Sequence, residues 1–100
     1  MTLKVTLSAY CVTPGGTETL SFHARPKMGV VLDTRYADNK DGQAHGGFDY
    51  QHFTDAAGDY RFTWTVDPFA PVGPADSLLG AVDRYGRANG RADFRVAHSC

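Results

Sequence analysis

The sequence predicts an all-β protein, a seven-stranded sandwich of two antiparallel sheets. The strongest observation is the run from Asp59 to Val66, in which large apolar or aromatic residues alternate with polar ones. Neighbouring side chains of a strand point to opposite faces, so this run predicts a central strand with one buried face. Similar segments recur along the chain with Gly, Pro, Asn or Asp at the joins, which is typical of antiparallel sandwiches rather than βαβ units.

Turn residues separate the seven segments that alternate in this way. Pro14-Gly15-Gly16 ends the first segment, because Pro lacks a backbone N–H and Gly frees the backbone. Residues 37–42 are rich in Asp, Asn and Gly, which favours a hairpin loop, and residues 86–90 predict the last hairpin loop. The proline-rich stretch 68–74 should cross from one sheet to the other. The expected strands are residues 3–11, 17–25, 28–36, 48–53, 59–66, 76–85 and 91–98, with 76–85 buried on both faces.

Length and composition predict one domain over residues 1–100 and argue against several kinds of partner. The 100 residues carry 10 basic and 11 acidic side chains, for a net charge of −1. This balance gives no electrostatic attraction for nucleic acid or anionic lipid. No apolar run approaches the roughly 18 residues that span a bilayer, and the first residues lack the apolar core of a signal peptide. We expect a monomer, or a trimmed part of a larger chain.

Three phrases of the sequence resemble the bacterial immunoglobulin-like modules of secreted and cell-surface proteins. They are PGGTETLSFHA, which begins at Pro14, DAAGDYRFTWTV, which begins at Asp55, and PFAPVGPADSLLGAVDRYGRANGRADFRV, which begins at Pro68. The likeness extends from Pro14 to Val96, and the third and fourth strands match more loosely. It implies an immunoglobulin-like sandwich that works as a spacer, adhesive or presentation module, and it transfers no catalytic residue.

The two cysteines are expected to form a disulfide. Cys11 shares the phase of Leu3 and Val5, and Cys100 shares the phase of Phe94 and Val96. In immunoglobulin-like sandwiches the first and last strands commonly lie side by side and parallel, so their C-terminal ends would meet. A bridge that closes a loop of about 90 residues stabilises a fold by roughly 4 kcal/mol. It would imply an oxidising compartment, whereas two unpaired thiols are the alternative.

The histidines do not show the spacing of a metal site. The size of the chain resembles that of periplasmic copper carriers of the CopC type, but Asp83-Arg84-Tyr85 stands in place of their Asp-x-His phrase. Residues 38–42 resemble a calcium loop but lack two of its ligands, so a turn is the expected role. We predict no metal and no cofactor, with a periplasmic metal-binding sandwich as the least favoured alternative. Four residues are expected at the surface or at strand edges: His23, His45, His52 and His98.

No phrase of a catalytic nucleophile, such as Gly-x-Ser-x-Gly, is present, so no enzymatic activity is predicted. Asp83 and Asp93 stand beside arginines and predict exposed cross-strand ion pairs. We expect a structural, spacer or adhesive module of an exported bacterial protein, located outside the cell or at its surface. The alternative is a carbohydrate- or protein-binding module whose partner is a protein or a cell-surface glycan. The aromatic residues expected to face such a ligand are Tyr36, Tyr50 and Phe53.

Overall fold

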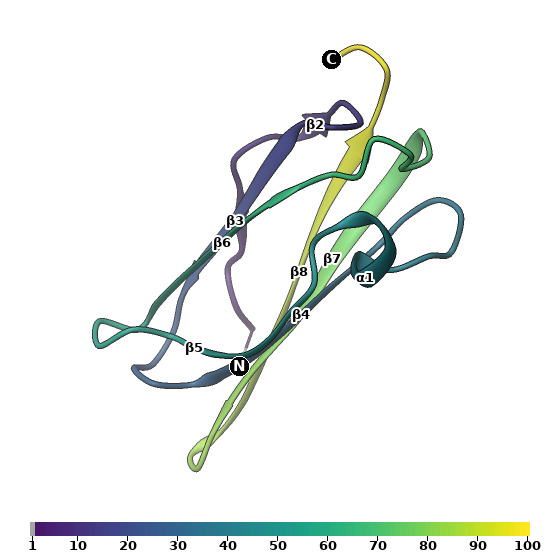
Figure 1. The fold of residues 1–100 in the computed structure, drawn as a ribbon. Helices are drawn as coiled ribbons and strands as arrows, with labels where there is room; N and C mark the ends of the chain where they lie inside the picture. Colours follow the sequence, from purple (N-terminus) through teal and green to yellow (C-terminus); the bar gives the residue numbers. More distant parts are fainter. Residues whose placement is uncertain (1) are drawn as a thin grey trace.

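Two β-sheets pack face to face in the computed structural model, which describes residues 2–100 (Figure 1). The smaller sheet has three strands in the order β1-β3-β6, and the larger sheet has five in the order β2-β8-β7-β4-β5. The prediction of an all-β sandwich is therefore confirmed. The described elements are β1 (Thr6–Leu7), β2 (Cys11–Val12), β3 (Thr17–His23), β4 (Gly29–Arg35), α1 (Gly42–His45), β5 (Asp49–Phe53), β6 (Asp59–Thr65), β7 (Gly73–Asp83) and β8 (Gly86–Val96).

The predicted first strand divides between the two sheets. The Ser8 N–H donates to the Thr19 carbonyl of the smaller sheet at 2.9 Å, whereas the Tyr10 carbonyl accepts from the Arg95 N–H of the larger sheet at 2.9 Å. The chain therefore crosses between the sheets over one residue. β1 runs antiparallel to β3, but β2 runs parallel to β8. The expectation of seven antiparallel strands is wrong, because the described residues form eight strands that include one parallel pair.

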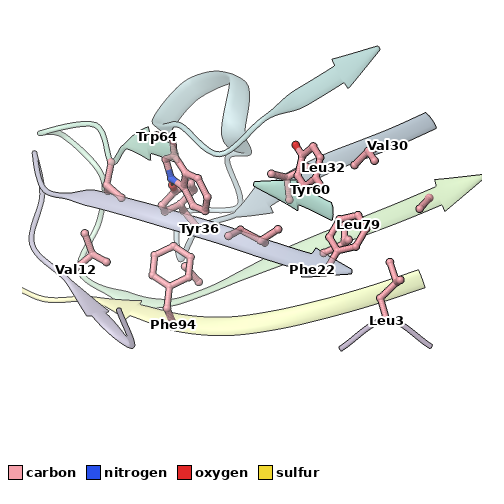
Figure 2. Packing of buried hydrophobic residues seen from close by; sticks show 14 of the residues in the cluster. Leu3, Val12, Phe22, Val30, Leu32, Tyr36, Tyr60, Trp64, Leu79 and Phe94 are labelled. Carbon is pink, nitrogen blue, oxygen red and sulfur yellow. The ribbon is translucent and has the colours of Figure 1, made fainter. Parts of the chain in front are cut away.

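The run that dominates the sequence pattern forms β6, and its two faces are as predicted. Tyr60 and Trp64 are each 6% exposed, whereas Arg61 and Thr63 point to solvent. Figure 2 shows Trp64 and Phe94 projecting into one core from opposite sheets, with ring centres 6.2 Å apart. The strand is not central, however. Among the described residues it pairs with β3 alone, so it lies at the edge of the smaller sheet.

β7 and β8 form a longer and tighter hairpin than predicted. Asp83 pairs with Gly86 across a two-residue turn, so the loop expected over residues 86–90 is part of β8. The Asp83 carboxylate accepts a hydrogen bond from the Tyr85 N–H at 2.8 Å and so stabilises this turn. β7 alternates between buried side chains and more exposed ones, whereas the sequence predicts burial on both faces. As predicted, the proline-rich stretch before β7 carries the chain from one sheet to the other.

The segment between β4 and β5 packs against the C-terminal half of β6. The short helix α1 begins after Asp41, whose carboxylate accepts a hydrogen bond from the Gln43 N–H at 3.0 Å. Gly46 then adopts a φ of 101°, and a Cβ at this position would lie 2.5 Å from the Thr65 carbonyl oxygen. The glycine therefore lets the loop approach the end of β6 that carries Trp64. β5 confirms the fourth predicted strand.

The molecule is elongated, with dimensions of 42 × 21 × 19 Å, and the two ends of the described chain are well separated (Figure 1). The C-terminal end lies at one extremity, whereas the β7–β8 hairpin projects beyond the N-terminal end. Thr2 pairs with Asn89 near the turn of the β7–β8 hairpin, whereas Cys100 follows the other end of β8. Within residues 2–100, no helix is long and apolar enough to cross a membrane.

Candidate functional site

The three aromatic residues expected to face a ligand do not form one surface. Tyr36 is 4% exposed, and its hydroxyl donates to the Gly46 carbonyl at 2.8 Å. Burial raises the pKa of this hydroxyl to about 12. The expected ligand-facing role of Tyr36 is therefore wrong, because the residue continues the inward phase of Leu32 beyond the end of β4. Tyr50 and Phe53 of β5, by contrast, are 56% and 64% exposed.

Phe53 belongs to an apolar row on the outer face of the larger sheet, made of Phe53, Gly29, Val82 and Val31. Gly29 pairs with Phe53 on one side and with Val82 on the other, and paired residues share a face. Gly29 has no side chain that could separate Phe53 from Val82. A Cβ at Gly29 would lie 3.7 Å from the Phe53 ring. Val31 follows on the same face of β4, and Val31 and Val82 are each 48% exposed. This apolar row is open to a ligand or a partner protein.

Cys11 and Cys100 form a disulfide, as predicted, with their Cα atoms 5.7 Å apart. The parallel pairing of β2 with β8 places Cys11 opposite Arg95, a few residues before Cys100. The two cysteines are separated by 89 residues in the sequence, so the bridge closes most of the chain into one loop. A loop of this length restricts the unfolded chain strongly, which stabilises the fold by about 4 kcal/mol.

His45 is buried, although the sequence predicts a surface position. Its side chain is 7% exposed, with Nε2 2.8 Å from Asp38 and Nδ1 3.0 Å from Asp67. Both carboxylates can accept from the ring when both nitrogens carry protons, so this arrangement favours the imidazolium. The hydrogen bond to Asp38 raises the pKa of His45, and the hydrogen bonds from His45 lower the pKa values of Asp38 and Asp67. This histidine cluster ties the loop before α1 to the chain that follows β6.

A second buried carboxylate, Asp49, connects β5 to β6. It is 5% exposed, and it accepts hydrogen bonds from the Tyr60 hydroxyl and from His52 Nδ1. Burial, together with the hydrogen bond to this carboxylate, raises the pKa of Tyr60. The side chain of His52 is 69% exposed, as predicted. An ionised Asp49 carboxylate can only accept, so the pairing requires a proton on His52 Nδ1. The adjoining hollow of about 510 Å³ is lined by no Ser, Thr or Cys side chain.

Another hollow, of about 720 Å³, lies over the ends of β4, β7 and β8 and has a charged lining. Arg35 and Arg91 approach the Asp76 carboxylate at 3.2 and 3.5 Å, and Arg91 also pairs with Asp93 at 3.0 Å. Asp93 therefore pairs with an arginine at an exposed position, but the expected cross-strand arrangement is wrong, because Arg91 and Asp93 both belong to β8. Arg95 lines the same hollow and has no ion pair among the described residues. One guanidinium is therefore available there to an anionic group.

No group of three or more His, Cys, Asp or Glu side chains within residues 2–100 is placed to hold a metal ion. In the stretch that resembles a calcium loop, Asp38 belongs to the histidine cluster and Asp41 caps α1. Asp83 pairs with Arg25 through two contacts of 2.8 Å, and these hydrogen bonds lower the pKa of Asp83 to about 2. Asp83 thus has an arginine partner, but the expectation of an exposed cross-strand pair is wrong, because Arg25 lies in the loop after β3 and the Asp83 side chain is only 15% exposed.

Glu18 is a fully buried carboxylate that the sequence reasoning does not identify. It shares the inward phase of Leu20 and Phe22, and this phase is the signal that could have found it. Its Oε1 accepts hydrogen bonds from the Ser8 hydroxyl at 2.9 Å and from the Ala9 N–H at 3.1 Å. Its Oε2 has no hydrogen-bond partner among the described residues. The carboxylate therefore holds the segment in which the chain crosses between the sheets.

The sequence matches no protein-family model and no curated protein. Among solved structures, the fold is similar to that of Spo0M, a sporulation control protein from Bacillus subtilis, with a TM-score of 0.56 and 14% identical residues. The similarity covers 95% of this chain and 48% of the Spo0M chain, so this chain spans about half the length of that protein. At 14% identity the similarity concerns the fold alone.

Proposed function

We propose that this chain is a non-enzymatic structural, spacer or adhesive module of an exported bacterial protein. The disulfide between Cys11 and Cys100 carries this proposal. Disulfides persist in oxidising compartments, and they are rare where thioredoxin and glutathione keep thiols reduced. A bridge that closes most of the chain suits a small domain that works outside the cytoplasm.

The positions of the chain ends support a spacer role. Thr2 lies beside the hairpin end of β8, and Cys100 lies beyond its other end, so the ends are separated along the 42 Å axis of the molecule (Figure 1). A domain whose ends are separated along its long axis extends a chain when it is placed between other domains. The disulfide also resists the unfolding of a module that bears tension between its ends.

We further propose that the sandwich is immunoglobulin-like. Its first strand contributes to both sheets, and the second part of that strand, β2, pairs in parallel with the last strand, β8. This pairing agrees with the arrangement that the resemblance implies for the first and last strands. The three phrases that carry the resemblance correspond to β3, to the turn and strand of β6, and to the β7–β8 hairpin.

Protease treatment of intact source cells tests the exported role. An antibody against the folded domain should detect a protein that externally added protease degrades or releases, while a cytoplasmic marker stays intact. Detection of the domain only in the protected cytoplasmic fraction would contradict the proposal. Lysed cells treated in the same way provide the control for protease susceptibility.

The apolar row favours a second candidate function, that of a carbohydrate- or protein-binding module. Phe53 of this row and Tyr50 of the same strand both expose more than half of their surface, and aromatic side chains stack on sugar rings or anchor protein interfaces. Binding of a glycan or of a cell-surface protein should weaken in Phe53→Ala and Tyr50→Ala. The same binding should stay unchanged in Tyr85→Ala, which removes an exposed aromatic from the hairpin turn. Equal binding by all three variants would remove this candidate.

A further inference from the structure

The edge of β6 turns main-chain groups to solvent. Both main-chain groups of Val66 bond toward β3, since its N–H donates to the Gly16 carbonyl and its carbonyl accepts from the Gly15 N–H, each at 2.8 Å. In an antiparallel ladder, the N–H and C=O of one residue point to the same side, and the side alternates from residue to residue. The even-numbered residues of β6 therefore bond to β3, and the odd-numbered residues point away from it.

The two ends of this outer edge are covered, but its centre is not. The Asp59 carbonyl accepts a hydrogen bond from the Asp55 N–H at 2.9 Å, and the Thr65 carbonyl lies against Gly46. Between them, the main-chain N–H and C=O groups of Arg61 and Thr63 have no partner among residues 2–100. Natural proteins protect such edges with a proline, a bulge, an inward-pointing charge or a charged side chain on the edge. β6 has no proline, no bulge and no inward-pointing charge, so Arg61 is the one charged side chain at the centre of this edge. Its positive charge disfavours a basic partner strand and not an acidic one.

A groove and an unpaired charge accompany these free groups. The hollow of about 510 Å³ lies between β5 and β6, with Phe53 and Phe62 in its lining. Phe62 is half-buried and lies on the inner face of β6, between the two residues whose main-chain groups are free. On the outer face, Arg61 has no ion pair among the described residues, whereas the neighbouring Asp59 is held by His23 at 2.7 Å.

We propose that the free edge of β6 binds an extended segment of a partner protein by strand addition. Arg61 and Thr63 would each form a pair of main-chain hydrogen bonds with the added strand. The side chain opposite Phe62 would enter the groove, so it should be apolar. The side chain beside Arg61 would face solvent, so it should be acidic. This inference goes beyond the proposed spacer role, because it depends on the fold and not on the compartment.

A capped seven-residue peptide in which valine alternates with glutamate is the probe for this site. Titration into ¹⁵N-labelled protein should shift the amide signals of Arg61 and Thr63 and slow their hydrogen exchange. Arg61→Glu should weaken binding by roughly fivefold or more, because it replaces an attractive charge pair with a repulsive one. The same variant should prefer a peptide with lysine in place of glutamate. Arg87→Glu, on the exposed face of β8, is the matched control and should bind as the unaltered protein does.

A second variant tests the main-chain hydrogen bonds directly. Thr63→Pro removes an N–H that points to solvent, a position at which edge strands tolerate proline, so the fold should survive and peptide binding should be lost. Native Trp64 fluorescence verifies the fold of this variant. Three results would overturn the proposal: unchanged binding by folded Thr63→Pro, signal shifts centred on the apolar row instead of Arg61 and Thr63, or a peptide-independent dimer that protects the same two amides. The last result would identify a second copy of the chain as the occupant.

Discussion

His45→Ala should destabilise the protein by about 2–4 kcal/mol, far more than a change at a surface histidine. The substitution removes hydrogen bonds from an imidazolium to two carboxylates, and hydrogen bonds to charged groups contribute about 1.5–3 kcal/mol each. Two such bonds would sum to about 3–6 kcal/mol. Because the Asp38 and Asp67 side chains are 32% and 28% exposed, water replaces part of what is lost and reduces the expected cost to about 2–4 kcal/mol. Surface substitutions typically change stability by less than about 0.5 kcal/mol.

The pKa shifts of the histidine cluster predict the pH range in which His45→Ala lowers the free energy of unfolding most. The pKa of His45 is raised above 6.5 in the folded state, so its contribution is complete below pH 6.5 and disappears as the pH rises through the folded value. The pKa values of Asp38 and Asp67 are lowered below 3.8, so their contribution is present above pH 3.8 and is lost as the pH falls through the folded values. The difference in unfolding free energy between the unaltered protein and His45→Ala should therefore be largest between pH 3.8 and pH 6.5.

Urea unfolding followed by Trp64 fluorescence, at several pH values, measures this difference. The control is His23→Ala, because the His23 side chain is 71% exposed and pairs with a carboxylate that is 60% exposed. This control should change the free energy of unfolding by about 0.5 kcal/mol or less. A His45→Ala protein as stable as His23→Ala, or a difference that does not decrease above pH 6.5, would refute the role assigned to the histidine cluster.

Three further predictions concern the core, the strand crossing and the disulfide. Trp64→Ala should cost about 3–5 kcal/mol in unfolding free energy, and native Trp64 fluorescence should resist iodide quenching; ready quenching would contradict its burial. Glu18→Leu should speed amide exchange at Ala9, because the N–H loses its acceptor, whereas Glu18→Gln keeps an acceptor oxygen and should change that exchange less. Reduction of the Cys11–Cys100 bridge should lower Tm by roughly 15–30 °C in calorimetry while the circular dichroism of the cold protein stays that of a β-sandwich; an unchanged Tm would show that the bridge contributes no stability.

The layered fold and the faces of the strands follow from local patterns in the sequence. The alternation in β6 predicts its buried and exposed faces because the side-chain period of a strand is two. Whether a strand is central or at an edge depends on its pairing with distant segments, and the alternation of β6 is the same in either place. The crossing between β1 and β2 is hidden for a similar reason. One residue carries the chain between the sheets, and the apolar odd positions continue across it.

The disulfide could be predicted because the parallel arrangement of the first and last strands brings their ends together. The burial of His45 could not be predicted. The carboxylates that hydrogen-bond to it and favour its protonated form come from a turn and from the chain after β6. Tyr36 lies in the inward phase of β4, so that phase alone argues for its burial. Gly46 and Gly47 weaken the strand pattern in the sequence, yet their conformation lets the loop close over the core. Such contacts between loops have no short-range signature in the sequence.

The redox state of Cys11 and Cys100 in the source cells tests the central claim most directly. Intact cells are treated with a membrane-permeant alkylating reagent before lysis, and the protein is then isolated without reductant for peptide mass spectrometry. The structure predicts one peptide pair joined through Cys11 and Cys100, with neither thiol alkylated. Two alkylated thiols, or a bridge between two copies of the chain, would contradict a covalently closed sandwich that works in an oxidising compartment.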